Sequence, residues 1–156
     1  MRMRPSKSAC ILSTVLLCSF AFSYEAANPS NTSAALREVE KSKAKADHAS
    51  INDKCYESVE VVRRLVELTK EQFDAGDLGP AQETLKEMVQ YADQAKEASQ
   101  HSGHKLKQAE IVLRKAHRRL DDLRQKLPYQ EQAPLEGALK QLEADDQEIL
   151  NQVLRH

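Results

Sequence analysis

Apolar residues recur along most of the chain at alternating steps of three and four, the spacing that places them on one face of an α-helix. Where a turn interrupts such a pattern, the phase is free to reset. From Ala81 to Leu127 the phase never resets, which predicts one continuous helix over about 81–127, through Gly103 and ~70 Å long. The positions on this seam are Ala81, Leu85, Met88, Ala92, Ala95, Ser99, Ser102, Leu106, Ala109, Leu113, Ala116, Leu120, Leu123 and Leu127.

Two shorter helices are expected before it. Ser33 can cap a Lys/Glu-rich helix over roughly 34–48, and the apolar phase then changes, so we expect a break at Ser50–Asp53. The second helix ends at Ala75-Gly76-Asp77-Leu78-Gly79-Pro80, with Gly past the end of one helix and Pro in the first turn of the next. Its buried face is expected to include Cys55, Val59, Val62, Val66, Thr69 and Phe73.

A last helix is expected after a turn that runs from Pro128 to Pro134, with Pro134 at its start. Its heptad seam of Leu135, Leu139, Leu142, Ile149 and Val153 is interrupted by Asp146. Helices joined by short turns pack antiparallel. The predicted fold is therefore all-α: an antiparallel long-helix hairpin or bundle, with the long central helix (about 81–127) and the C-terminal helix packed back on it.

The N-terminus reads as a secretory leader. A basic start (Met1 to Lys7) precedes 14 apolar or small residues (Ala9 to Phe22), and Ala21-Phe22-Ser23 offers small residues for cleavage. The stretch is too short to span a bilayer. We expect residues 1–23 to be a signal peptide, 24–32 a flexible tether and 33–156 a single helical-bundle domain. The product is expected to be exported, periplasmic or extracellular, with no transmembrane span.

Composition agrees with long helices, since 30% of the 156 residues are charged and 4% are aromatic. Removing residues 1–23, which hold three basic residues and no acidic one, changes the net charge from −1 to −4. This balance gives no reason to expect nucleic acid as a partner. Cys55 is then the one remaining cysteine, for which we expect burial as a small apolar residue; pairing between chains is the alternative.

Two charged segments are expected to face one another. Residues 105–126 carry eight basic residues against three acidic ones, a net charge of +5, and the last helix carries five acidic residues against Lys140. Pairing between neighbouring helices accounts for both runs. The alternative is that the basic segment is a site for an acidic polymer, an anionic lipid headgroup or nucleic acid.

The sequence contains no Gly-rich phosphate loop, HExxH motif, paired CxxC motif or nucleophile in a recognisable turn. We therefore expect no enzyme activity, no catalytic residues, no cofactor and no metal site. His101 and His104 stand three apart, a spacing that lets two imidazoles share a helix face and bind a metal, but further ligands are missing nearby in sequence. We interpret them as exposed polar residues.

The segment Phe73-Asp74-Ala75-Gly76-Asp77-Leu78-Gly79-Pro80-Ala81, with Leu65 and Leu68 upstream, resembles the inter-helix turn of a tetratricopeptide repeat. The resemblance covers about 30 residues of one hairpin. No second copy follows 34 residues on, where Glu110 stands, and Asp93 replaces the repeat's final Pro. A superhelical peptide-binding array is therefore not expected.

The chain also resembles uncharacterised bacterial exported helical proteins with the same Phe-Asp-Ala-Gly-Asp turn and an Arg-Arg-Leu-Asp-Asp segment, here Arg118 to Asp122. That resemblance implies no activity. The leading hypothesis is a non-enzymatic exported scaffold or protein-interaction module, whose partner is a second copy or an envelope protein. The alternative is an envelope ligand- or metal-responsive binding protein that uses the basic face or His101 and His104.

Overall fold

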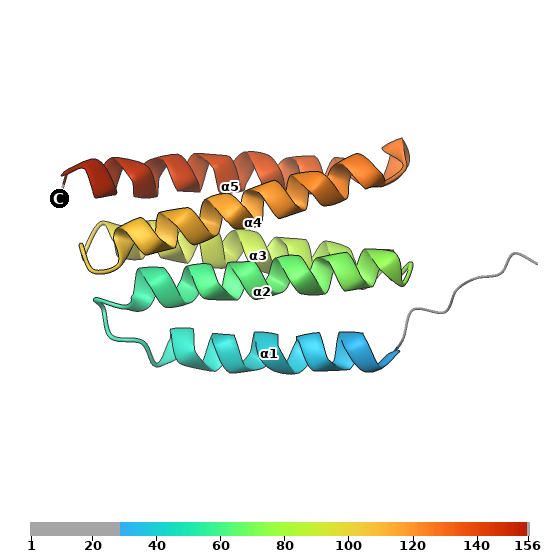
Figure 1. Cartoon of the computed structure of the whole chain (residues 1–156), viewed down its shortest axis with the longest axis horizontal. Coiled ribbons are helices and arrows are strands. Elements are labelled where there is room, and N and C mark those ends of the chain that lie inside the picture. Colours follow the sequence, from blue (N-terminus) through green and yellow to red (C-terminus); the bar gives the residue numbers. More distant parts are fainter. Residues whose placement is uncertain (1–28, 156) are drawn as a thin grey trace, which may run out of the picture.

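The computed structural model describes residues 29–155, and all the regular structure in this range is helical, which confirms the all-α class. The helices are α1 (Pro29–Asp47), α2 (Lys54–Asp74), α3 (Leu78–Ser99), α4 (Leu106–Lys126) and α5 (Tyr129–Arg155). They lie side by side as rods that alternate in direction along the chain (Figure 1). The predicted signal peptide lies outside the described residues.

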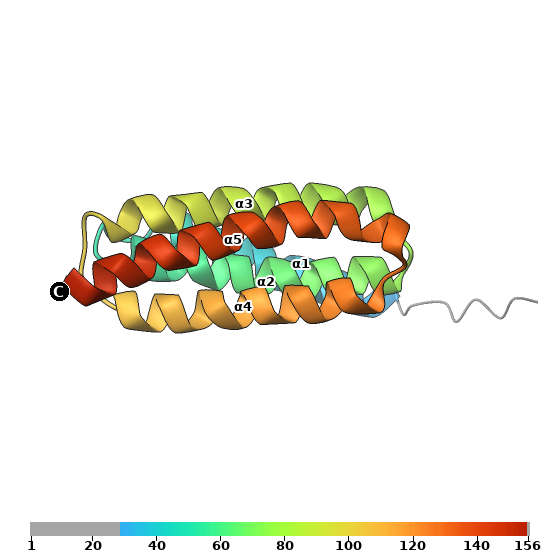
Figure 2. The same cartoon turned by 90° about the horizontal axis from the view of Figure 1, so that it is seen from above.

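Four of the helices form a closed ring. α2 packs against α3 and α4, and α5 packs against the same two helices, so the order around the ring is α2, α3, α5, α4. α3 and α4 lie on opposite sides, with α5 between them at the front (Figure 2). α1 packs outside the ring against α2. The expected antiparallel bundle is therefore confirmed.

The interior of the ring follows the predicted heptad positions. Its largest fully buried side chains include Leu65, Met88, Leu113, Leu120 and Leu142. Small residues stand between them: Ala92, Ala95, Ala109 and Ala116 are all 0% exposed. Because alanines bring helix backbones close together, the mixture of leucine and alanine packs the ring densely, with Phe73 as its one buried aromatic residue in the described range.

The α2–α3 turn has the predicted stop signal. Gly76 adopts a left-handed backbone with φ of 77°, which suits a residue without Cβ. Its N–H donates to the Phe73 carbonyl at 3.0 Å, and the N–H of Asp77 donates to the Gln72 carbonyl at 2.8 Å. These two bonds satisfy carbonyls at the end of α2 in the pattern of a Schellman motif. The break expected at Ser50–Asp53 is also confirmed, between α1 and α2.

The prediction of one continuous helix over 81–127 is wrong. α3 ends at Ser99 and α4 begins at Leu106, so the chain reverses direction at residues 100–105. The predicted spacing of buried positions nevertheless continues into the loop, where Ser102 is 8% exposed. Its hydroxyl donates to the Asn52 carbonyl at 3.1 Å and accepts from the His104 N–H at 3.1 Å. Ser102 is buried against the α1–α2 connection, and not on a helix seam.

Two element boundaries also differ from expectation. α1 begins at Pro29, so residues 29–32 of the predicted tether are helical, and 24–28 lie outside the described residues. α5 begins at Tyr129, which places Pro134 inside the helix instead of at its start. Proline there removes one N–H, whose carbonyl partner four residues earlier belongs to Gln130, an exposed residue that water can reach.

None of the helices in residues 29–155 combines the length and the apolar character that crossing a bilayer requires.

Candidate functional site

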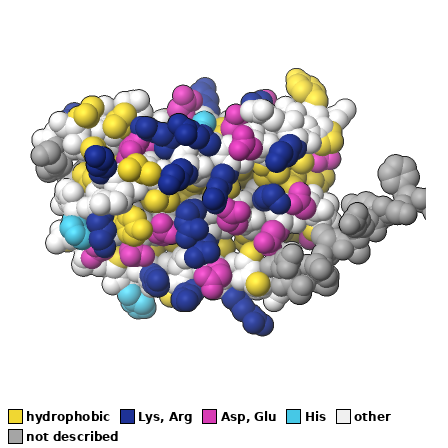
Figure 3. All heavy atoms as spheres, viewed as in Figure 1, with side chains coloured by type: hydrophobic (Ala, Val, Ile, Leu, Met, Phe, Trp, Pro, Cys, Tyr) yellow, Lys and Arg dark blue, Asp and Glu magenta, His cyan; other side chains and the backbone are white. Residues whose placement is uncertain are grey.

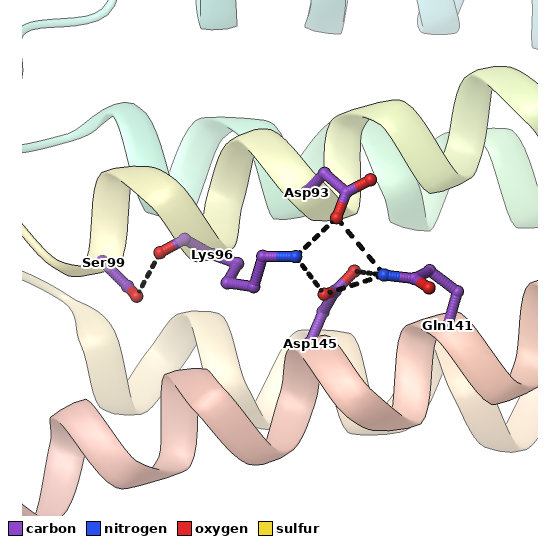
Figure 4. Close-up of polar contacts among 5 residues, drawn as sticks. All are labelled: Asp93, Lys96, Ser99, Gln141 and Asp145. Carbon is purple, nitrogen blue, oxygen red and sulfur yellow. Dashed lines mark hydrogen bonds and ion pairs between the residues drawn. The ribbon is translucent and has the colours of Figure 1, made fainter.

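A partly buried polar cluster joins α3 to α5 (Figure 4). The Lys96 ammonium donates to Asp145 Oδ1 at 2.8 Å and to Asp93 Oδ1 at 2.6 Å. The Gln141 amide donates to the same two oxygens at 3.3 Å each. Since the Asp145 side chain is 1% exposed, Lys96 brings a positive charge to a carboxylate that water hardly reaches.

The electrostatics of this cluster favour a fixed ion pair over proton chemistry. Hydrogen bonds to Asp145 and Asp93 raise the pKa of Lys96 further above its ordinary value, so it stays charged and is not a base or a nucleophile. Burial raises the pKa of Asp145, and the neighbouring ammonium offsets this in part. The arrangement tethers α5 to α3. The heptad pattern did not predict this role of Lys96. The burial of its neighbours Ala95 and Ser99 shows that another helix packs closely against α3 here.

A second cluster joins α5 to α4. Arg114 forms an ion pair with Glu110 on its own helix and reaches Asp146 Oδ2 at 3.7 Å. Glu110 is 5% exposed. Burial and the Glu110 charge raise the pKa of Asp146, whereas Arg114 and His117 lower it. Asp145 and Asp146 are consecutive in sequence, and they fasten α5 to α3 and to α4 respectively.

Pairing between the basic and acidic segments is present at particular positions. Besides Arg114 and Asp146, Arg124 Nη1 lies 3.9 Å from Glu136 Oε1 on α5, and Arg119 forms an ion pair with Glu67 on α2. On α4, therefore, Arg114 and Arg124 pair with α5, and Arg119 pairs with α2. Four other basic residues of this segment form no salt bridge within residues 29–155: Lys107, Lys115, Arg118 and Lys126.

Lys126 lines a groove between α2 and α4, whereas Lys107, Lys115 and Arg118 lie on the outward side of α4. They surround Ile111, which is 41% exposed, and Arg114 completes the group at its edge. We call Lys107, Ile111, Arg114, Lys115 and Arg118 the α4 basic face. Glu110 is the one acidic residue among positions 106–119, and it is buried. On the side of the molecule over which α4 runs, Lys and Arg side chains gather across the centre (Figure 3).

A groove of about 450 Å³ lies next to this face, between α2 and α4. Val66, Leu123 and Leu127 form its apolar part. Its charged lining alternates in sign, because both helices contribute acids and bases there: Glu67, Lys70, Asp74, Arg119, Asp122 and Lys126.

His101 and His104 do not share a helix face, because both lie in the α3–α4 loop. His101 Nδ1 is 3.0 Å from the Glu97 carbonyl, and His104 Nδ1 is 3.1 Å from Asp53 Oδ1. The geometry considered for a shared metal site is therefore wrong. In the part of the chain that the structure describes, no group of three or more His, Cys, Asp or Glu side chains is arranged to hold a metal ion.

Cys55 is 0% exposed, which confirms the expected burial. Burial raises the pKa of its thiol to about 12, so the thiolate is scarce at neutral pH. A buried thiol in this form is neither a ready nucleophile nor placed to pair with another chain. Its role in the described fold is to pack against the apolar interior.

Comparisons with protein-family models, curated proteins and solved structures found no match to the chain. The segment that resembles a tetratricopeptide-repeat turn forms the α2–α3 connection, and the resemblance itself stays a prediction.

Proposed function

We propose that the protein is a non-enzymatic, exported helical scaffold that binds another protein through the α4 basic face. The observation that supports this most directly is the group of exposed basic side chains on α4 that no acidic residue of positions 29–155 neutralises. The buried charges, by contrast, are used to fasten α5 to its neighbours. The bundle thus provides a rigid support for a charged surface.

The export half of the proposal rests on the predicted leader. N-terminal sequencing of the protein recovered outside the cytoplasm should find Tyr24 or a residue within a few positions of it. Recovery of the full-length chain from the cytoplasm would contradict export.

The interaction half is tested by affinity capture from the envelope fraction followed by mass spectrometry. A charge-reversed protein (Lys107→Glu, Lys115→Glu and Arg118→Glu) is compared with the unaltered one. We expect a protein partner that is captured by the unaltered chain and lost with the reversed one, because like charges across an interface repel. An unchanged set of captured proteins would show that the α4 basic face has no part in binding.

A further inference from the structure

We infer that the partner contributes an acidic α-helix, which lies along the α4 basic face. This inference rests on the proposed function and names the kind of surface that would satisfy it. Within the bundle, α4 already binds acidic side chains on two sides: Arg114 and Arg124 contact α5, and Arg119 contacts α2. The outward side of α4 also carries basic residues, but these have no acidic partner within residues 29–155.

The spacing of this outward side suits a helix. Lys107, Ile111, Lys115 and Arg118 follow steps of four, four and three, so they form a straight ridge about 17 Å long at 1.5 Å per residue. A partner helix with acidic residues at matching steps can place one carboxylate near each basic residue. Ile111, 41% exposed at the centre of the ridge, offers an apolar contact that a purely ionic site would not need.

The surroundings of the ridge favour a narrow partner over a flat one. Acidic residues border it on both sides: Asp146 of α5 lies 3.7 Å from Arg114, and Glu67 of α2, whose side chain is 41% exposed, pairs with Arg119. The exposed Asp122 stands four residues after Arg118, at the end of the ridge. A broad anionic surface such as a membrane would meet these carboxylates together with the basic ridge. A single helix touches the ridge and passes between them. Charge complementarity therefore selects an acidic helix over an anionic lipid surface.

The test uses a synthetic helical peptide of about 18 residues, with Glu at alternating steps of four and three around a central Leu. A scrambled peptide of the same composition serves as the reference. Binding to the purified protein is measured by fluorescence anisotropy at two salt concentrations. We expect the patterned peptide to bind at least tenfold more tightly than the scrambled one, and its affinity to fall as salt rises.

Two variants with equal change in net charge locate the site. Reversal of Lys107, Lys115 and Arg118 to Glu should weaken binding of the patterned peptide on the order of tenfold or more. Reversal of Arg37, Lys41 and Lys140 to Glu changes two lysines and one arginine that are exposed elsewhere, and it should leave the affinity within about twofold. Circular dichroism establishes that both variants keep the helical fold.

Several results of these binding experiments would overturn the inference. Equal binding of the patterned and scrambled peptides would show that charge alone is recognised. Equal losses in the two variants would show that the α4 basic face is not the site. Binding to vesicles with about 30% phosphatidylglycerol, without binding to the peptide, would identify the ridge as a lipid-binding surface.

The outcome is separable from that of the proposed function. Capture of a partner that depends on Lys107, Lys115 and Arg118, together with failure of the peptide, would retain the interaction module and reject the acidic helix. Sedimentation of the purified protein adds a further outcome: a dimer that the same charge reversal dissociates would identify a second copy as the partner and overturn the acidic-helix inference.

Discussion

At the scale of single residues, the consecutive Asp145 and Asp146 determine how α5 is held. One carboxylate pairs with Lys96 of α3, and the other lies near Arg114 of α4. A buried ion pair is weak evidence for stability, because desolvation offsets much of the attraction. Removing one partner is different, since the remaining charge is left buried without compensation.

Lys96→Met should therefore lower the free energy of unfolding by about 2–4 kcal/mol, because Asp145 loses its ammonium partner. The double variant Lys96→Met with Asp145→Leu should recover to within about 1 kcal/mol of the unaltered protein. Lys86→Met is the control: its side chain is 68% exposed, and its pair with Glu83 should contribute less than about 1 kcal/mol. Urea unfolding followed by circular dichroism measures all three. Equal effects of the two lysine substitutions would mean that Asp145 is hydrated.

Asp121 of α4 and Asp146 of α5 should change the stability of the protein in opposite directions as pH rises. Burial raises the pKa of Asp146 above 3.8, so the folded protein takes up a proton there more readily than the unfolded chain. This proton uptake stabilises the folded state at low pH, and the stabilisation is lost as pH rises through the folded pKa. The hydrogen bonds from Arg124 lower the pKa of Asp121, so its stabilisation is present above 3.8 and lost as pH falls through the folded pKa.

The measurement compares each Asn variant with the unaltered protein across pH. The quantity of interest is the free energy of unfolding of the unaltered protein minus that of each variant. For Asp146→Asn this difference should fall as pH rises above 3.8. For Asp121→Asn it should rise as pH increases from below 3.8. Slopes of the same sign for both variants would contradict the assigned environments.

At the scale of the helices, the chain reversal between α3 and α4 decides the architecture. A continuous helix over 81–127 would separate Gln82 and Gln125, both exposed, by ~65 Å at 1.5 Å per residue. In the bundle both residues lie near the same end, so spin labels at these sites should be less than about 35 Å apart, given interhelix distances of 8–10 Å. Electron–electron double resonance measures the distance. A value above about 50 Å would restore the single long helix.

The sequence predicted the helices and their buried faces but not this reversal, and the reason is physical. Heptad spacing reports which residues are buried, and not which neighbour buries them. Ser102 satisfies the pattern because its hydroxyl bonds to Asn52, a residue fifty positions away. Local signals did exist, since Gly103 lies beside Ser102 in a polar segment. The phase of the apolar pattern alone could not show that a loop separates α3 from α4.

The same limit applies to the candidate site. The opposite charges of the last two helices predicted pairing, and Arg114–Asp146 and Arg124–Glu136 follow that prediction. Which basic residues would stay unpaired depends on the rotation of α4 in the ring, because its two flanks face α2 and α5. The packing geometry therefore had to be known before the unpaired residues could be distinguished from the paired arginines. The unpaired residues of the α4 basic face are Lys107, Lys115 and Arg118, and the paired ones are Arg114, Arg119 and Arg124.

At the scale of the whole molecule, α1 is the helix with the fewest attachments. It packs outside the ring, and Val39 and Ala46 are its buried apolar residues within the described range. Its polar contacts with the ring are few: Lys43 Nζ lies 2.7 Å from Glu87 Oε1, Arg64 Nη2 lies 3.5 Å from Glu38 Oε2, and Lys54 Nζ donates to the Ala46 carbonyl at 2.6 Å. The ring helices bury many more apolar side chains each, so the bundle should not open as one uniform unit.

Native-state hydrogen exchange should therefore show α1 amides opening at a lower free energy than those of α2 and α4, because helix stability in proteins comes mainly from the packed face. Val39→Ala should speed exchange in α1 with little effect on the ring. Leu113→Ala should lower protection throughout the four-helix ring, by about 2–5 kcal/mol, since Leu113 is 0% exposed at its centre. Equal opening free energies for α1 and α4 in the unaltered protein would mean that all five helices unfold together. A distinct α1 would leave the four-helix ring, with α4 in place, as the stable support for the α4 basic face.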